Sequence, residues 1–411
     1  LTISGANVTV TASSEISVSG ESTSGQLAVH VDKTAEPAGK VVLNLEGLTL
    51  SNSTAAPIYV EAIGDEVQIS AKNGTTNTIS DGTSHTDTYV DSDGNTNPVN
   101  GAIFSRDDLK LKGKGTLIVN GNTEDGIVCK NDLKIWNGNI TVNAADDGIR
   151  GNDSVRIGDP DATDYSTLSV TVNTNNGTSG GDGIKTNSDE DGKGYITMSG
   201  GTVNIDSYAD GIQAEQTFTM NGGDLNITTY QGANYTGSSS GGNGGWGGPG
   251  GGNSSNGSQT MTFNGGYTYV NAAGDGLDSN GNISFNGGYV FVSQTGGGNG
   301  PLDCGDSNNS ITYSGGTVIA AGSSDMFETP SSYSFLSQTS VSAGQTITFT
   351  DASGNVLATF TLPNGSSEMV MCSDSSSVTC YTGGTLSGTT YFASQDLSLI
   401  HISEPTRPRL I

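Results

Sequence analysis

Basic residues, histidine and tryptophan are scarce in this chain. Its 411 residues include 15 Lys and Arg against 42 Asp and Glu, which gives a formal net charge of −27, with three His and two Trp. So negative a chain repels nucleic acid and anionic membrane surfaces, and it attracts cations. An anionic ligand would therefore need a bridging metal ion or a local basic patch. The shortage of His also argues against a Ser/His/Asp triad and against zinc.

Good helix formers and long apolar runs are missing as well. No stretch approaches the length that spans a bilayer, so we expect no membrane insertion. Glycine, by contrast, is abundant at 62 residues, and so are Asn, Ser and Thr. Apolar and polar residues alternate through most of the chain, which is the period of β-strands. These features predict an all-β fold with many tight turns.

A repeat runs through the sequence. Two short alternating strands, joined by a Gly-Gly or Asn-Gly turn, precede an Asp-Gly-aliphatic motif such as DDGIRGN at 146–152. The interval is 22 residues from Gly126 to Gly148 and 28 from Gly183 to Gly211. That period is typical of solenoid proteins, and the unit has no helical pattern. We predict a parallel β-helix whose coils lie about 4.8 Å apart.

Equivalent positions of stacked coils should form inward ladders. The predicted aliphatic ladder contains Ile127, Ile149, Ile184, Ile212, Leu277 and Leu302. A ladder of small residues two positions later includes Cys129 and Cys304, which we interpret as core residues. Cys372 and Cys380 are close enough in sequence to close a hairpin disulfide, and two free buried thiols are the equal alternative.

Changes in the pattern suggest domain boundaries. The predicted domains are residues 1–336, the β-helix; residues 337–396, a truncated small antiparallel β module; and residues 397–411, which resemble the translated read-through of a sequencing adapter. A polar loop between Ser80 and Asn100 and a Gly-rich insert from Gly232, which carries Trp246, interrupt the β-helix. We expect the native termini to lie outside the printed sequence.

The Asp of each Asp-Gly motif should lie on one corner of the stack. Carboxylates about 5 Å apart repel one another unless they splay into water, cap backbone N–H groups or share a cation. Capping is common for Asp before Gly, whereas oxygen-rich sites without His or Cys suit Ca²⁺. The loop at 187–195 also places Asn187, Asp189 and Asp191 in the alternation of an EF-type loop, although Met198 replaces the final Glu. The candidate Ca²⁺ ligands are Asp125, Asp146, Asp147, Asp182, Asp210, Asp275, Asp189 and Asp191.

The residue after each aliphatic position should point outward. Arg150, Lys185 and Gln213 occupy this place on successive coils, and with Trp246 they are the candidate glycan-binding residues. Polyuronate lyases built on parallel β-helices use Ca²⁺ and a Lys or Arg that takes the C5 proton. Lys185 and Arg150 would fill that catalytic role. Neutralisation of the Asp column is the alternative role, and we favour it.

The quoted motifs also resemble a known family. GQLAVHVDKTAEPAGKVVLNLEGLTL, IFSRDDLKLKGKGTLIVNG and the repeated Asp-Gly motif are similar to bacterial carbohydrate-binding-domain proteins, whose founding member is a calcium-containing cell-surface β-helix. The resemblance covers roughly residues 1 to 336. It implies a right-handed parallel β-helix like that of polysaccharide lyases, and a secreted or cell-surface location. It also implies binding of polygalacturonate or cellulose without established catalysis.

Three functions follow from these observations. We favour a monomeric, secreted or surface-attached protein that binds acidic plant polysaccharide, or cellulose, with the help of Ca²⁺. One alternative is a polyuronate lyase. The other is an adhesin or structural solenoid in which Ca²⁺ only stiffens the coils. Catalysis is the less favoured interpretation because neutralisation of the Asp column is the favoured role of Lys185 and Arg150.

Overall fold

The computed structural model describes residues 1–230, 259–305, 308–383, 390–392, 397–398 and 409–410. Within these residues every regular element is a β-strand and no helix occurs, so none could cross a membrane as a helix. The all-β prediction is confirmed. The chain divides into two compact units, Leu1–Thr219 and Met220–Ile411, and each is described by itself. Strand β24 (Thr217–Met220) spans the division.

Three rows of strands build the first unit. Row 1 contains β1 (Thr2–Ser4), β2 (Asn7–Val10), β4 (Leu27–His30), β6 (Ile58–Ala62), β11 (Gly101–Ser105), β14 (Asp125–Cys129), β17 (Ile149–Gly151), β20 (Ile184–Lys185) and β23 (Ile212–Gln213). Its strands pair in parallel from β2 onward, whereas β1 and β2 are antiparallel. Row 1 therefore takes one strand from each repeat.

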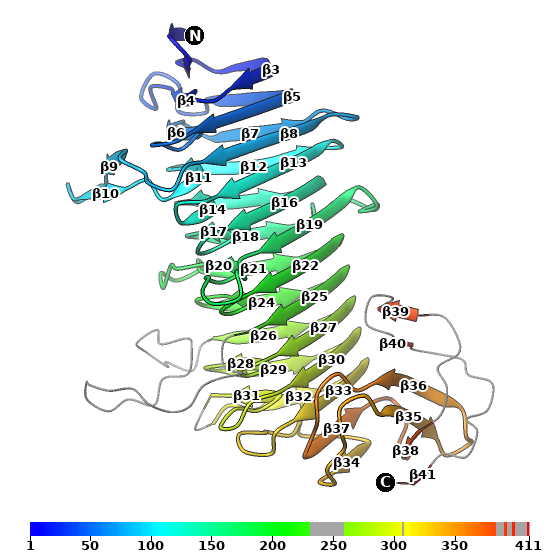
Figure 1. Ribbon diagram of the computed structural model, residues 1–411. Helices are drawn as coiled ribbons and strands as arrows, with labels where there is room; N and C mark the ends of the chain where they lie inside the picture. Colours follow the sequence, from blue (N-terminus) through cyan, green and yellow to red (C-terminus); the bar gives the residue numbers. More distant parts are fainter. Residues whose placement is uncertain (231–258, 306–307, 384–389, 393–396, 399–408, 411) are drawn as a thin grey trace. The chain divides into compact units, whose positions relative to one another are not determined.

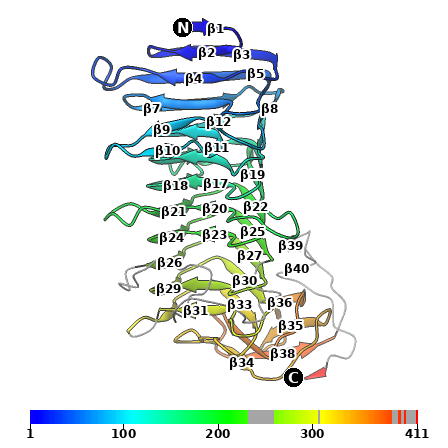
Figure 2. The ribbon, with the colours of Figure 1, turned by 60° about the vertical axis from the view of Figure 1, so that its left-hand side comes forward.

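Rows 2 and 3 begin on a shared strand. β3 (Ser14–Ser22) pairs in parallel with the long β5 (Lys40–Asn52), whose two halves start the two rows. Row 2 continues with β7 (Glu66–Ala71), β12 (Asp108–Gly113), β15 (Asp132–Ile135), β18 (Ser154–Ile157) and β21 (Tyr195–Met198). Row 3 continues with β8 (Thr76–Asp81), β13 (Thr116–Gly121), β16 (Gly138–Ala144), β19 (Leu168–Asn173) and β22 (Thr202–Ser207). Figures 1 and 2 show these strands layered in sequence order, from blue to green.

Each repeat visits the rows in the same order. Strands β11, β12 and β13 form one repeat, and β14, β15 and β16 form the next. Ile127, Ile149 and Ile184 pair in register and are 0% exposed, and Ile212 continues the register. This part of the predicted aliphatic ladder is confirmed. The period-2 alternation thus buries one side of every strand in a shared core.

The polar loop after β8 folds back over row 1. It contains the antiparallel hairpin of β9 (Thr88–Val90) and β10 (Thr96–Pro98), which stands beside β11 in Figure 1. The Tyr89 ring lies 5.3 Å from the Phe104 ring, measured between centroids. Val99, Phe104 and Val128 are buried together in a small apolar cluster. The loop therefore covers the outer side of row 1 at β11 and β14.

The second unit mixes parallel and antiparallel strands. Its strands are β25 (Asp224–Thr229), β26 (Thr260–Phe263), β27 (Tyr267–Ala272), β28 (Leu277–Ser279), β29 (Asn282–Phe285), β30 (Tyr289–Gln294), β31 (Leu302–Cys304), β32 (Ile311–Tyr313), β33 (Thr317–Gly322), β34 (Phe335–Ser337), β35 (Thr346–Asp351), β36 (Val356–Thr361), β37 (Glu368–Cys372), β38 (Val378–Thr382), β39 (Thr390–Phe392), β40 (Leu397–Ser398) and β41 (Arg409–Leu410). The strands up to β33 pair in parallel, and β28 pairs with β31 through Leu277 and Leu302 as expected. β37 is antiparallel to β33, and β35 is antiparallel to β36 and β38.

Aromatic packing joins these last strands to the parallel ones. Phe291 of β30 meets Phe360 of β36 edge-on, with centroids 4.7 Å apart, and Phe349 of β35 belongs to the same buried cluster. The predicted antiparallel strands after residue 337 are therefore present, while the domain boundaries at 336 and 396 stay predictions. Residues 397–411 contribute β40 and β41, and the rest of that segment lies outside the described residues.

The cysteines are buried in both units. Cys129 and Cys304 have 0% and 8% exposure, which confirms that both belong to the core. Cys372 and Cys380 are free, buried thiols, so the hairpin disulfide does not form here. Burial raises the pKa of each of these two thiols to about 12. Both will stay protonated at neutral pH and behave as small apolar groups.

Candidate functional site

The Asp-Gly motifs form a column at the start of the row 1 strands. The N–H of Asp147 donates to Oδ1 of Asp125, and the N–H of Asp182 donates to Oδ1 of Asp147. The N–H of Asp210 continues the series by donating to Oδ1 of Asp182, at 2.9 Å. Each Asp therefore accepts a hydrogen bond from the backbone of the equivalent Asp one repeat later. The column is a chain of capping bonds between repeats.

The glycines of the motif let these corners approach closely. A Cβ on Gly126 would lie 2.2 Å from Cγ1 of Val142 and 2.6 Å from the carbonyl oxygen of Gly148. The N–H of Gly126 in turn donates to the carbonyl of Asp147, at 3.0 Å. A side chain at this place would push the repeats apart. The sequence motif thus pairs a capping acid with a residue that leaves room for the next corner.

The other carboxylate oxygen, Oδ2, of Asp125, Asp147 and Asp182 faces a basic side chain. Arg150 bonds to Oδ2 of Asp125, and Nζ of Lys185 donates to Oδ2 of Asp182 at 2.7 Å. Nη1 of Arg150 also lies 3.8 Å from Oδ2 of Asp147. Burial raises the pKa of Asp125 to about 7, with Arg150 opposing the rise. Burial lowers the pKa of Lys185, but Asp182 and Asp147 outweigh it, so that pKa is raised.

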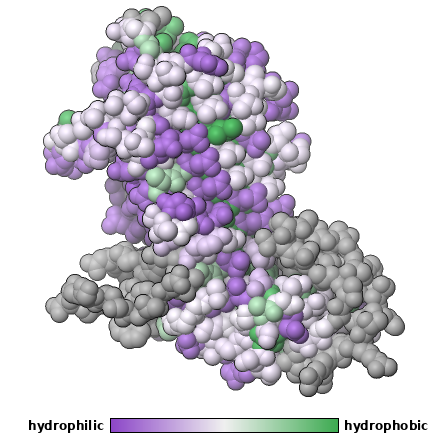
Figure 3. Space-filling model, in the orientation of Figure 1, coloured by the Kyte–Doolittle hydropathy of each residue, from purple (hydrophilic) through white to green (hydrophobic). Residues whose placement is uncertain are grey.

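The outward-facing residues of row 1 change from apolar to polar along the stack. Tyr59, Phe104 and Val128 pair in register and pack under the β9–β10 loop. Arg150 and Lys185 continue that register, followed by Gln213. These three half-exposed side chains, predicted from the repeat, therefore lie in one line, about 4.8 Å apart from strand to strand. Figure 3 shows hydrophilic residues over much of the first unit's visible face.

Two further bases surround the Tyr89 ring at the edge of this line. The guanidinium carbon of Arg106 lies 5.2 Å from the ring centroid, and Nζ of Lys130 lies 5.8 Å from it. Nη2 of Arg106 donates to the carbonyl of Val90 at 2.8 Å. Sequence reasoning missed this cluster because it depends on how the loop at 81–100 folds back.

The remaining predicted ligands lie apart from one another. Asp146 is exposed beside the column, and Asp189 and Asp191 are exposed on the loop before β21. Asp275, in the second unit, accepts the N–H of Gly300 at 2.7 Å. Trp246 lies outside the described residues. Within the described residues, no group of three or more His, Cys, Asp or Glu side chains is arranged to hold a metal ion.

A family profile described as "Carbohydrate-binding domain-containing protein" matches residues 4–300. The chain belongs to this family. A protein of the same description from Acetivibrio thermocellus is 38% identical over 144 residues, which are 35% of this chain and 47% of that protein. The chain therefore spans about half the length of this curated relative.

A solved structure is also similar to this chain. It is described as the polysaccharide lyase-like protein from C. thermocellum, as a gadolinium derivative, and it is 32% identical. The match covers 56% of this chain and 84% of that chain, with a TM-score of 0.48.

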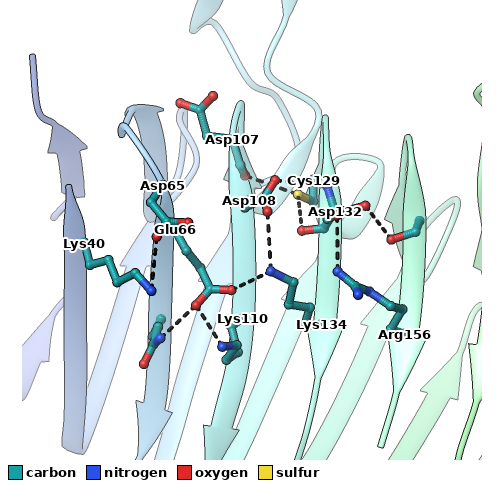
Figure 4. Close-up of polar contacts among 12 residues, drawn as sticks. Lys40, Asp65, Glu66, Asp107, Asp108, Lys110, Cys129, Asp132, Lys134 and Arg156 are labelled. Carbon is teal, nitrogen blue, oxygen red and sulfur yellow. Dashed lines mark hydrogen bonds and ion pairs between the residues drawn. The ribbon is translucent and has the colours of Figure 1, made fainter. Parts of the chain in front are cut away.

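A second set of charged side chains lies in two lines along the strands of row 2. Lys110, Lys134 and Arg156 pair in register, and Glu66, Asp108 and Asp132 form a parallel line two residues earlier. Figure 4 shows Lys110 and Lys134 converging on Glu66, each with an N···O distance of 2.9 Å. Nη2 of Arg156 lies 3.2 Å from Oδ2 of Asp132. The two lines compensate each other's charge.

The existing partners of the Asp-Gly carboxylates show how well these acids could bind calcium. Asp125 and Asp182 each use one oxygen on a backbone N–H and the other on a base. Calcium needs six to eight oxygen ligands, so binding there would require Arg150 and Lys185 to move. The first-unit column therefore fits calcium poorly. The sequence contains no Lys or Arg between Lys193 and Arg407. No base from that stretch therefore competes with calcium for Asp275.

Proposed function

We propose that this chain binds acidic polysaccharide of the polygalacturonate type on the outer side of row 1, and that it acts as a secreted or cell-surface protein. The observation that carries this proposal is the line of Arg150, Lys185 and Gln213 in one register. An extended glycan could meet one basic or amide group at each strand. Membership of a carbohydrate-binding family supports the class of ligand. A bacterial protein reaches plant wall polysaccharide only outside the cell.

We also propose that the parallel rows of the first unit form a right-handed parallel β-helix. Parallel strands joined by a crossover are right-handed in nearly all known proteins, because the strand twist favours that hand. A solenoid of this kind gives a flat, repeating outer face to a repeating polymer. The regular register of row 1 supports this reading.

Calcium dependence is a separate part of the proposal. We place the calcium requirement near Asp275 in the second unit rather than on the first-unit column, because Arg150 and Lys185 already occupy the column. Asp278 and Asp303 pair in register near Asp275, so their like charges lie close together. A divalent cation would relieve that repulsion.

The lyase alternative is weaker than the binding role. A lysine that takes the C5 proton must first be neutral, and Asp182 and Asp147 raise the pKa of Lys185. Arg150 is held by Asp125 and Asp147, and an arginine stays protonated in any case. Both side chains are better suited to holding an anion than to acting as a base.

Retention of the protein on immobilised polygalacturonate tests the proposal. The residue 1–396 protein should be retained, and Lys185→Gln should elute earlier than Lys72→Gln, which removes an equal charge elsewhere in the unit. Chelation should weaken retention. Retention that no chelator changes would remove calcium from the proposal, while absence of retention on polygalacturonate and cellulose would leave the structural-solenoid alternative.

A further inference from the structure

Most bases of the first unit have a carboxylate partner. Lys33 pairs with Asp107, and Lys40 pairs with Asp65, for example. Among the described residues, Arg106, Lys112, Lys114 and Lys130 form no ion pair, although the chain holds 42 acids and 15 bases. Of these four, Arg106 and Lys130 lie against the same ring, that of Tyr89. Two unpaired bases at one place in so acidic a chain require an explanation.

The surroundings of Lys130 make its charge costly. Its side chain is half-buried, and Nζ lies 5.7 Å from the Phe104 ring and 5.8 Å from the Tyr89 ring. Burial lowers its pKa, and Arg150 lowers it further, while Asp125 opposes the change. Asp125 is already bonded to Arg150. Attraction to the aromatic faces offsets only part of the lost hydration.

We propose that Arg106 and Lys130 form a binding site for the carboxylate of a uronic acid unit, with the Tyr89 ring as the wall on which the sugar packs. The inference rests on the proposed function and names a site within it. A carboxylate here would supply the missing negative charge to both bases. The aromatic ring would meet the apolar face of the sugar, as aromatic residues do in many ligand pockets.

The site makes direct contact with the ligand and needs no bridging ion. Arg106 keeps further N–H donors after its bond to the carbonyl of Val90, so it can still engage a carboxylate. Arg150 is the next base along row 1, one strand beyond Val128, and would meet the neighbouring unit of the same chain. The ligand thereby gains a fixed starting point at the β9–β10 hairpin.

Calorimetric titration with polygalacturonate, in chelator, tests this site. Lys130→Gln and Arg106→Gln should each weaken binding about tenfold, as expected when a charged hydrogen bond is lost. Lys112→Gln is the matched control, because Lys112 is half-exposed on row 2 and forms no ion pair among the described residues. Lys130→Arg should keep most of the affinity. Fully methyl-esterified polygalacturonate should bind the native protein and Lys130→Gln equally weakly.

The outcomes separate the site from the wider proposal. If the native protein binds polygalacturonate but Lys130→Gln and Lys112→Gln bind equally well, the site is wrong and the proposed function stands. If the native protein binds polygalacturonate neither in chelator nor in calcium, both are wrong, and binding that appears only in calcium overturns this site alone. Thermal unfolding distinguishes a structural role, since a binding lysine should be replaceable by Gln without loss of melting temperature. A fall in melting temperature together with unchanged affinity would also overturn the site.

Discussion

The acids of the two units have different partners. In the first unit, Asp125, Asp147 and Asp182 lie beside Arg150 and Lys185. In the second unit, the sequence from residue 220 to residue 396 contains no Lys or Arg at all. Its acids bond to uncharged groups instead: Asp275 accepts the N–H of Gly300, Glu328 accepts the N–H of Cys304, and Asp374 accepts the hydroxyl of Tyr313.

This difference separates two uses of one motif. Where a base is present, the Asp-Gly acid is an internal part of the stack, and its charge is already compensated. Where no base is present, as at Asp275, burial raises the pKa and only the N–H of Gly300 opposes the rise. In the calcium arrangement that we propose, a divalent cation would gain more there, because it has no ammonium or guanidinium to displace. Identical motifs therefore need not have identical ligands.

The largest expected effect comes from removing Glu66, which pairs with two lysines of row 2. Glu66→Ala should lower the free energy of unfolding by about 3–5 kcal/mol, because it leaves the buried Lys110 without its carboxylate and Lys134 with Asp108 alone. Urea denaturation measures this loss. Glu46→Ala, which breaks the more exposed pair with Lys72, is the control and should cost less. Equal losses would show that burial of the pair is unimportant.

The pH dependence of this pair has a defined sign. Burial raises the pKa of Glu66, but Lys134 and Lys110 outweigh it and the net pKa is lowered. The folded pKa is below the unfolded value, so the stabilisation is complete above that value, about 4.3, and is lost as the pH falls below it. The Glu66→Ala variant should lose this acid-sensitive part of the unfolding curve.

The next test compares one capping acid from each unit. Asp125→Ala removes the cap of Asp147 and a partner of Arg150, so we expect a loss of about 3 kcal/mol. Asp275→Ala removes the cap of Gly300 and an acceptor for the Asn299 amide, but leaves no base unpaired, so it should cost about 1 kcal/mol. Thermal or urea unfolding measures both. Asp125→Asn keeps the capping oxygen and should fall between native and Ala; similar losses for the two Ala variants would erase the comparison.

Calcium should act on the second unit alone. Free calcium at ten times its dissociation constant should raise the free energy of unfolding by about 1.4 kcal/mol. Asp275→Asn should abolish this increment, whereas Asp182→Asn, the matched change beside Lys185, should leave it unchanged. Calorimetric unfolding with and without chelator measures the increment. An increment lost in Asp182→Asn and kept in Asp275→Asn would return calcium to the first-unit column.

Local periodicity predicted much of this structure. The alternation and the repeat interval placed Ile127 and Ile149 in one inward ladder and Arg150 and Lys185 in one outward line, since parallel register repeats the same residue positions. The lines of charged residues on row 2 could also have been predicted from the sequence. Aligning Lys110 with Lys134 on successive repeats would have revealed them.

The partners of each side chain were not predictable in this way. The motif shows that Asp125 lies at a corner, but not that one oxygen caps Asp147 and the other meets Arg150. The cluster of Arg106, Tyr89 and Lys130 depends on a long loop that folds back over row 1. Such contacts are set by tertiary packing between segments whose spacing carries no period.

The smallest expected effect concerns His85, which carries a positive charge only when its imidazole is protonated. Nδ1 of His85 lies 2.6 Å from the carbonyl oxygen of Val99, and Nε2 lies 3.0 Å from Oδ2 of Asp81. Asp87 also faces the ring, with Oδ1 3.8 Å from Nδ1. An imidazole with acceptors at both nitrogens is held best when it is protonated. His85 therefore ties the loop that carries the β9–β10 hairpin to β8 as a third kind of compensated pair.

Hydrogen exchange of the loop amides should reveal this conditional pair. Burial lowers the pKa of His85, but Asp81 and the carbonyl of Val99 outweigh it and the pKa is raised. The stabilisation is thus complete below about pH 6.5, the unfolded value, and disappears as the pH rises through the folded pKa. Exchange at Thr86, corrected for its intrinsic rate, should therefore accelerate above neutral pH. His85→Gln should abolish that step; a step that survives the substitution would assign the titration to another group.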